Sequence, residues 1–343
     1  MRAALLLGAA LAACSNGTPP ASTQPAAAPT TPPPLAATGK GRVVTARFKS
    51  AALGVEKAVV VYLPGGYDAD PNARWPVYYY LHGLGGDETN WVEVGKLDAA
   101  ADQLGLAAIV VMPDGDDGFY SNSDAPIDYD ACIKDGTGLM SPAQPKRATC
   151  VRRRAYEDYI TKDLIGWVDA TYRTIAAREG RGVAGLSMGG FGALELAMRN
   201  PQLFAAAASH SGVDALLYAG PHPYVAGKAE LLEDVTKWGV TAGPIGAWIR
   251  SIFGKDVANW RAHDPAALAQ KLAPGTLALY LDCGTEDEFA LHDGAAYLHD
   301  VLAARRIEHE YYRGPGHHDF AFWRDRLPKS LAFLRARVTS ARR

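Results

Sequence analysis

The sequence lacks an apolar run of the roughly 20 residues needed to cross a bilayer, so it predicts no membrane-spanning helix. Its charge is nearly balanced: 35 Lys and Arg against 37 Asp and Glu give a formal net charge of −2. This balance gives no electrostatic reason to expect nucleic acid as a partner. The sequence also has no internal repeat and no His-Glu-x-x-His zinc motif. We therefore expect neither a metal nor a cofactor.

Cysteine is scarce, with four in 343 residues, and the spacings fit no zinc motif. Cys132 and Cys150 bracket a polar segment containing Gly and Pro, which predicts a surface insertion closed by a disulfide. Two free thiols are the alternative. Cys283 stands apart, and we interpret it as a small buried apolar residue rather than a nucleophile.

The first 40 residues differ in composition from the rest. Residues 1–14 combine a charged start, an apolar run and small residues, which is typical of a signal peptide. Their ending resembles a bacterial lipobox, which would make Cys14 a lipidated first residue; the alternative is a plain signal peptide, a secreted protein and an incidental cysteine. Residues 15–40 are rich in Pro, Ala and Thr without aromatics and predict a disordered tether. We expect an exported protein that contacts the membrane of the bacterial envelope only through a lipid anchor.

Residues 41–343 read as one folded domain in which strand and helix patterns alternate. This alternation predicts a mostly parallel sheet with helices on both faces. The stretch 213–259 interrupts the alternation with prolines and glycine-rich turns, so we expect it to cross over the top of the sheet. The predicted strands are 42–49 and 57–63, which open the domain as an antiparallel pair, and then 77–81, 107–112, 182–186, 203–209, 277–281 and 309–313.

The motif Gly185-Leu186-Ser187-Met188-Gly189 is the strongest chemical signal in the sequence. An apolar strand pattern precedes it and a helix pattern follows, which is the context of a nucleophile elbow. A Cβ at either flanking glycine would collide across so tight a turn. The alternative is a chance match in a chain with 35 glycines. We predict that Ser187 is the nucleophile of a serine hydrolase.

A serine nucleophile needs a base, which a third group orients. On a sheet of this kind the chain order is Ser, acid, His. Of the nine histidines, His317 and His318 are the two that directly follow the last predicted strand, so they are the candidates for the base. The expected acid is Asp287, which lies past the turn that follows the predicted strand 277–281. Asp282 and Glu286 are the alternatives.

The oxyanion of an acyl-transfer reaction needs two backbone donors. We expect the N–H of Met188, which follows the nucleophile, and that of Leu84 in the glycine-rich loop after the strand 77–81. A glycine-rich turn without chemistry is the alternative for that loop. Four aromatic residues could line a substrate pocket, although core packing explains them equally well: Trp91, Tyr120, Trp260 and Trp323.

Taken together, these segments resemble the esterase family of α/β-hydrolases, which includes S-formylglutathione hydrolases, feruloyl esterases and mycolyltransferases. The resemblance runs from about residue 42 to the C-terminus and rests on 80–86, 156–160, 185–190, 260–265, 284–287 and 318–324. It implies the α/β-hydrolase fold and favours Asp287. In the family a small or polar residue and then an aromatic follow the histidine, which implies His318 as the base. The predicted insertion and lipoprotein front end depart from the family and argue against a cytosolic S-formylglutathione hydrolase.

These observations predict a serine carboxylic ester hydrolase that works through an acyl-enzyme. Its substrate would be a small-molecule or carbohydrate-linked ester outside the cytoplasm. An acyltransferase using the same triad, as in the mycolyltransferases, is the first alternative. A surface protein that has lost its activity and only binds a ligand is the second. No motif separates the hydrolase from the transferase.

Overall fold

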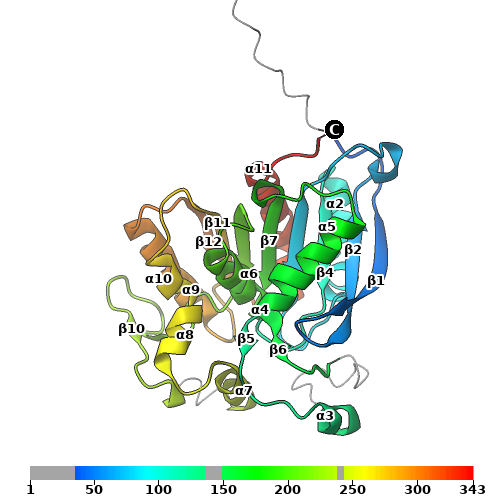
Figure 1. The fold of residues 1–343 in the computed structure, drawn as a ribbon. Coiled ribbons are helices and arrows are strands. Elements are labelled where there is room, and N and C mark those ends of the chain that lie inside the picture. Colours follow the sequence, from blue (N-terminus) through cyan, green and yellow to red (C-terminus); the bar gives the residue numbers. More distant parts are fainter. Residues whose placement is uncertain (1–34, 136–148, 238–242, 343) are drawn as a thin grey trace, which may run out of the picture. The chain divides into compact units, whose positions relative to one another are not determined.

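An eight-stranded sheet organises the computed structural model, which describes residues 35–135, 149–237 and 243–342 (Figure 1). The first two pairs of neighbours, β1 with β2 and β2 with β4, are antiparallel, and every later pair is parallel. This confirms the predicted α/β-hydrolase class. In spatial order the strands are β1 (Arg42–Ser50), β2 (Val55–Leu63), β4 (Ile109–Pro113), β3 (Val77–Leu81), β7 (Arg181–Leu186), β8 (Ala206–His210), β11 (Ala278–Gly284) and β12 (His309–Gly314).

Helices cover both faces of the sheet (Figure 1). The helical run α4–η2–α5 (Tyr156–Asp158, Tyr159–Leu164, Ile165–Thr171), α6 (Met188–Arg199) and α10 (Leu291–Ala304) pack on one face, and α2 (Leu97–Gln103) and α11 (Phe320–Arg337) on the other. The shorter helical segments are η1 (Tyr67–Ala69), α1 (Asn90–Glu93), α3 (Tyr129–Asp135), η3 (Arg178–Gly180) and α9 (Pro265–Ala269). The helix expected directly after the Ser187 motif is thus present as α6.

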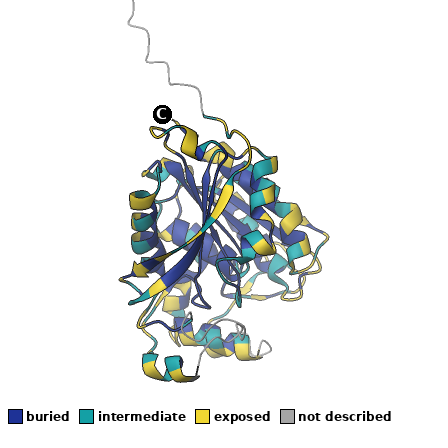
Figure 2. Ribbon diagram, turned by 90° about the vertical axis from the view of Figure 1, so that its right-hand side faces the viewer, coloured by how far each residue is buried: buried dark blue, intermediate teal, exposed yellow. Residues whose placement is uncertain are grey.

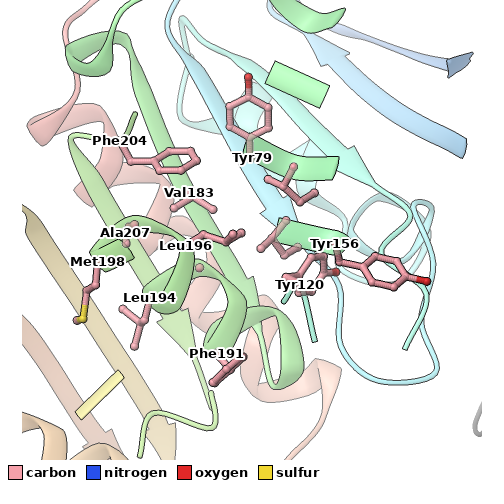
Figure 3. Packing of buried hydrophobic residues seen from close by; sticks show 14 of the residues in the cluster. Tyr79, Tyr120, Tyr156, Val183, Phe191, Leu194, Leu196, Met198, Phe204 and Ala207 are labelled. Carbon is pink, nitrogen blue, oxygen red and sulfur yellow. The ribbon is translucent and has the colours of Figure 1, made fainter. Parts of the chain in front are cut away.

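Each central strand feeds two cores, because successive side chains of a strand point to opposite faces. In β3, Tyr79 and Leu81 join the core beneath α6, whereas Tyr78 and Tyr80 join the one beneath α11. Figure 3 shows part of the first core, with side chains of α6 beside those of neighbouring strands. Figure 2 shows the central strands buried and the outer sides of the helices exposed. Burial on both faces explains why these strand sequences are continuously apolar.

The excursion expected between residues 213 and 259 forms small elements at one end of the sheet, at the lower left of Figure 1. They are β9 (Tyr218–Gly220), β10 (Glu230–Leu231), η4 (Val235–Lys237), α7 (Gly243–Phe253) and α8 (Val257–His263). Two further short strands, β5 (Asn122–Ser123) and β6 (Arg154–Ala155), pair with each other. Cys132 and Cys150 form the disulfide that the sequence predicts, and Cys283 is a free, buried thiol.

The signal peptide 1–14, its lipobox residue Cys14 and the tether as far as residue 34 lie outside the described residues. The last residues of the expected tether already bond to the folded domain. Leu35 N–H donates to Ala341 O at 3.0 Å, and Thr38 N–H donates to Gly65 O at 2.9 Å. Within the described part of the chain, no helix has both the length and the apolar content needed to span a membrane.

Candidate active site

Ser187 occupies the turn between β7 and α6 with a backbone φ of 54°. Positive φ is strained for a residue with a side chain. Neighbours hold it there: Ser187 N–H donates to His210 O at 2.8 Å. A Cβ on Gly185 would meet the backbone of Gly189, and one on Gly189 would meet Leu81 O. The requirement for both flanking glycines is therefore confirmed.

Three side chains from distant parts of the chain meet at this turn. His318 Nε2 lies 2.9 Å from Ser187 Oγ, and its Nδ1 lies 2.7 Å from Asp287 Oδ2. His317, the other candidate for the base, points elsewhere: its Nδ1 lies 2.9 Å from Glu288 Oε1, and its side chain is 60% exposed. The structure therefore brings together the serine, histidine and acid expected from the sequence.

Asp287 is buried and fully hydrogen-bonded. Its Oδ1 accepts from the N–H groups of Phe289 at 2.9 Å and Leu291 at 3.4 Å, and its Oδ2 faces His318. The Cys283 thiol also donates to Oδ2, at 3.6 Å. Burial raises the pKa of that thiol above its usual range, so it remains protonated. Cys283 is thus buried, as the sequence predicts, and is also a direct neighbour of Asp287.

The imidazole of His318 is enclosed by two aromatic rings. Phe289 and Trp323 meet it edge-on, at ring distances of 4.9 and 5.0 Å. Only 9% of the His318 side chain is exposed. Together with the bond to Asp287, these contacts leave the ring one orientation, with Nε2 toward Ser187.

The glycine-rich loop after β3 is hydrogen-bonded to the segment 114–120. His82 Nδ1 lies 2.8 Å from Gly83 O, and Gly115 N–H donates to His82 Nε2 at 2.8 Å. Gly85 N–H donates to Asp117 Oδ1 at 2.8 Å. Because Gly115 occupies the Nε2 lone pair, Nδ1 carries the proton and donates to Gly83 O. No sequence motif marks residues 114–119 for this role, since their only local signal is a run of Asp and Gly.

Leu84, Met188 and Ser187 line one cavity of about 900 Å³. Met188 opens α6, and the first N–H groups of a helix have no partner within it. Leu84 N–H has no acceptor in the part of the chain that the structure describes. Both residues thus line the cavity that contains Ser187, as expected for donors to an oxyanion.

Three of the four aromatic residues expected to line a substrate pocket lie elsewhere, so the prediction is wrong for them. Trp91, Tyr120 and Trp260 are at most 1% exposed and do not line the cavity. Their polar atoms donate to backbone carbonyls, for example Trp91 Nε1 to Leu81 O at 3.0 Å. They pack as core residues, which buries their rings and satisfies their donors. Trp323, the fourth expected residue, does line the cavity, together with Phe119, Phe289 and Phe320.

The alternative acids have other partners. Asp282 is fully buried against His210, whose Nδ1 lies 2.9 Å away, and His210 Nε2 lies 2.8 Å from Ser330 Oγ. This second Ser-His-Asp array has no solvent-exposed atoms to offer a substrate, because all three residues are 0% exposed. Glu286 accepts a hydrogen bond from Gly316 N–H.

The chain is similar in sequence to a known esterase and a known hydrolase. The chain is 36% identical over 169 residues to Esterase Rv1288 of Mycobacterium tuberculosis, covering 48% of this chain but only 31% of that protein. It is 27% identical over 245 residues to the S-formylglutathione hydrolase of Bos taurus, covering 71% and 74% of the two chains. The chain thus spans about a third of the length of the mycobacterial relative and about three quarters of the bovine one.

Solved structures share the fold at low sequence identity. An S-formylglutathione hydrolase from Agrobacterium tumefaciens superposes with a TM-score of 0.64 at 20% identity, covering 88% of this chain and 97% of the other. A CE1 ferulic acid esterase from Anaeromyces mucronatus, solved with ferulic acid, gives 0.58 at 18% identity, covering 88% and 92%. The Esterase family model, described as "Putative esterase", matches residues 50–334. Because that match covers well over half of the chain, the chain is an enzyme of the Esterase family of α/β-hydrolases.

Proposed function

We propose that this enzyme is a serine carboxylic ester hydrolase, with Ser187 as nucleophile, His318 as general base and Asp287 as the orienting acid. The observation that carries the proposal is the continuous pair of hydrogen bonds, 2.9 Å from Ser187 to His318 and 2.7 Å from His318 to Asp287. A nucleophile and base within hydrogen-bond reach, with the base oriented by a third group, is the arrangement that activates a serine hydroxyl.

In the first step His318 Nε2 takes the hydroxyl proton as Ser187 Oγ bonds to the ester carbonyl carbon. The carbonyl oxygen becomes an oxyanion, which the N–H groups of Leu84 and Met188 stabilise. The intermediate collapses when His318 returns the proton to the departing alcohol, leaving an acyl-serine. Water then repeats the sequence and releases the acid. Asp287 keeps the proton of the neutral imidazole on Nδ1 and stabilises the imidazolium.

The cavity supports an ester with a sizeable apolar part. Much of its wall is aliphatic, from Leu84, Val213, Leu232, Ile245 and Ile249. Its volume of about 900 Å³ is near the upper end for a small-molecule site. Besides a small ester, a substrate linked to a carbohydrate is compatible with this size.

We further propose that the whole chain is an exported lipoprotein, with 1–14 as signal peptide, Cys14 as the lipidated residue, 15–34 as tether and 41–343 as esterase domain. The composition of the first 40 residues supports this organisation. The disulfide between Cys132 and Cys150 also favours an oxidising compartment. Substrates outside the cytoplasm follow from that location.

The replacement Ser187→Ala tests the proposal. Hydrolysis of p-nitrophenyl acetate should fall by at least 10³-fold, because the nucleophile is removed while the oxyanion donors remain. Labelling by a fluorophosphonate probe should also disappear. A variant that keeps its activity would refute the assignment. If wild type neither labels nor hydrolyses, the inactive binding protein is favoured. Release of acyl product to an added sugar rather than to water would identify the acyltransferase.

A further inference from the structure

A second His–Asp pair lies at the wall of the same cavity, outside the proposed triad. His222 Nδ1 lies 2.7 Å from Asp293 Oδ2. The carboxyl group of Asp293 is buried to 1% exposure, whereas the imidazole is 53% exposed and lines the cavity together with Ser187. His222 belongs to the excursion after β9, and Asp293 to the first turn of α10.

The surroundings of Asp293 determine which ring nitrogen of His222 faces the cavity as an acceptor. Asp293 Oδ1 accepts from Tyr224 N–H at 2.8 Å, and Arg313 Nη2 lies 3.8 Å from the same oxygen. A carboxylate with these neighbours accepts a hydrogen bond and has no proton to donate, so Nδ1 carries the imidazole proton. Nε2 of the neutral ring is then an acceptor. It has no hydrogen-bond partner within the described residues.

The imidazole is also supported from the side. The Tyr218 ring meets it edge-on at 5.5 Å and itself stacks on Tyr297 at 5.8 Å. Tyr218 lines the cavity next to His222, and its hydroxyl donates to Pro221 O. The cavity lining thus includes a polar, aromatic pair formed by these two residues besides aliphatic side chains such as Ile245 and Ile249.

Resting on the proposed ester hydrolase, we propose that His222 is a specificity-determining residue that accepts a hydrogen bond from a hydroxyl of the substrate's alcohol part. The aliphatic wall suits an acyl chain, which has no donor to offer Nε2. A polyol or sugar does, and the adjacent Tyr218 ring gives its C–H groups an apolar surface. The preferred substrates are therefore esters whose alcohol part carries free hydroxyls.

Three butyrate esters with the same acyl group test this inference: propyl butyrate, 1-butyrylglycerol, and the same glycerol ester with both free hydroxyls methylated. We expect His222→Phe to lower kcat/KM for 1-butyrylglycerol about tenfold relative to propyl butyrate, mainly through KM, since one hydrogen bond is lost. The methylated ester, which can accept but not donate, should show no such loss relative to propyl butyrate. His222→Gln, whose amide oxygen accepts, should restore part of the preference.

His299→Phe is the matched control, because this histidine lies in α10, does not line the cavity and pairs with His309 at 2.7 Å. It should leave the ratio between the three esters as in wild type. An equal effect of His222→Phe on all three esters would overturn the inference, as would no effect on any. Failure of the ester hydrolase proposal itself would appear separately, as hydrolysis of propyl butyrate that survives Ser187→Ala.

Discussion

The exchange Asp287→Asn tests the proposed triad most sharply, because the structure predicts which way the new amide turns. Asp287 Oδ1 accepts from two backbone N–H groups, those of Phe289 at 2.9 Å and Leu291 at 3.4 Å. Only the oxygen of an asparagine amide can take that position. The amide nitrogen therefore occupies the place of Oδ2, 2.7 Å from His318 Nδ1, and donates to it.

This reversal changes the tautomer of the base. With Nδ1 accepting from the amide, the imidazole proton moves to Nε2, the atom that lies 2.9 Å from Ser187 Oγ. That nitrogen can no longer take the proton of the serine hydroxyl. Loss of the correct tautomer and of the negative charge beside the imidazolium lowers kcat by about 10⁴-fold, equivalent to about 5 kcal/mol in the activation barrier.

The assay is hydrolysis of p-nitrophenyl acetate at pH 7.5, with wild type, Asp287→Asn, Glu286→Gln and Asp282→Asn compared after their folding is verified by circular dichroism. The Glu286 variant is the matched control, because its carboxylate bonds to Gly316 N–H and not to a histidine. Asp287→Asn with more than a tenth of wild-type kcat would refute the reasoning. So would a loss of comparable size in Glu286→Gln.

Two further predictions concern buried charges. Lys57 Nζ lies 2.6 Å from Asp114 and 2.7 Å from Asp116, and its side chain is 1% exposed. Lys57→Met leaves both carboxyl groups without this cation and should lower the free energy of unfolding in urea by about 3–5 kcal/mol. A loss below 1 kcal/mol would contradict this prediction. Burial raises the pKa of Asp214 to about 7, from 3.8, while its Oδ1 accepts from Ser209 Oγ. The native state therefore holds a proton that the unfolded chain has released, so this group's contribution to stability falls as pH rises from about 4 to 7. Asp214→Asn should remove that pH dependence. The difference in unfolding free energy between the variant and wild type should therefore favour the variant by about 3 kcal/mol more at pH 8 than at pH 5. A difference that does not change with pH would refute the raised pKa of Asp214.

The buried array of Asp282, His210 and Ser330 shows why distances alone do not identify an active site. Its bonds of 2.9 and 2.8 Å match those at Ser187. Its serine, however, lies inside α11, is fully buried and also bonds to Tyr80 OH at 3.0 Å. Ser187 differs because its strained turn presents the hydroxyl to a cavity of about 900 Å³. The two Ser-His-Asp arrays therefore differ in whether a substrate can reach the serine, and the backbone geometry at Ser187 provides that access.

Local patterns determined much of this protein from the sequence alone. Continuously apolar runs, separated by helical periods, predicted the mostly parallel sheet, since strands covered on both faces have no polar side. The glycines around Ser187 predicted the elbow because only they fit the turn. Asp287 and the pair His317 and His318 were found because such groups follow strand ends. The choice of His318 came from the family resemblance, and in the structure its Nε2 lies 2.9 Å from Ser187 Oγ.

Tertiary structure alone decided what depends on contacts between distant segments. Trp91, Tyr120 and Trp260 were expected at the cavity, but an aromatic residue has the same local pattern whether it packs in a core or lines a pocket. His222 and Asp293 are 71 positions apart, and neither belongs to a recognisable motif. A sequence pattern reports the periodicity of a single strand or helix. The wall of a cavity is formed by side chains from several strands, helices and loops. Its residues can therefore be identified only when the tertiary structure is known.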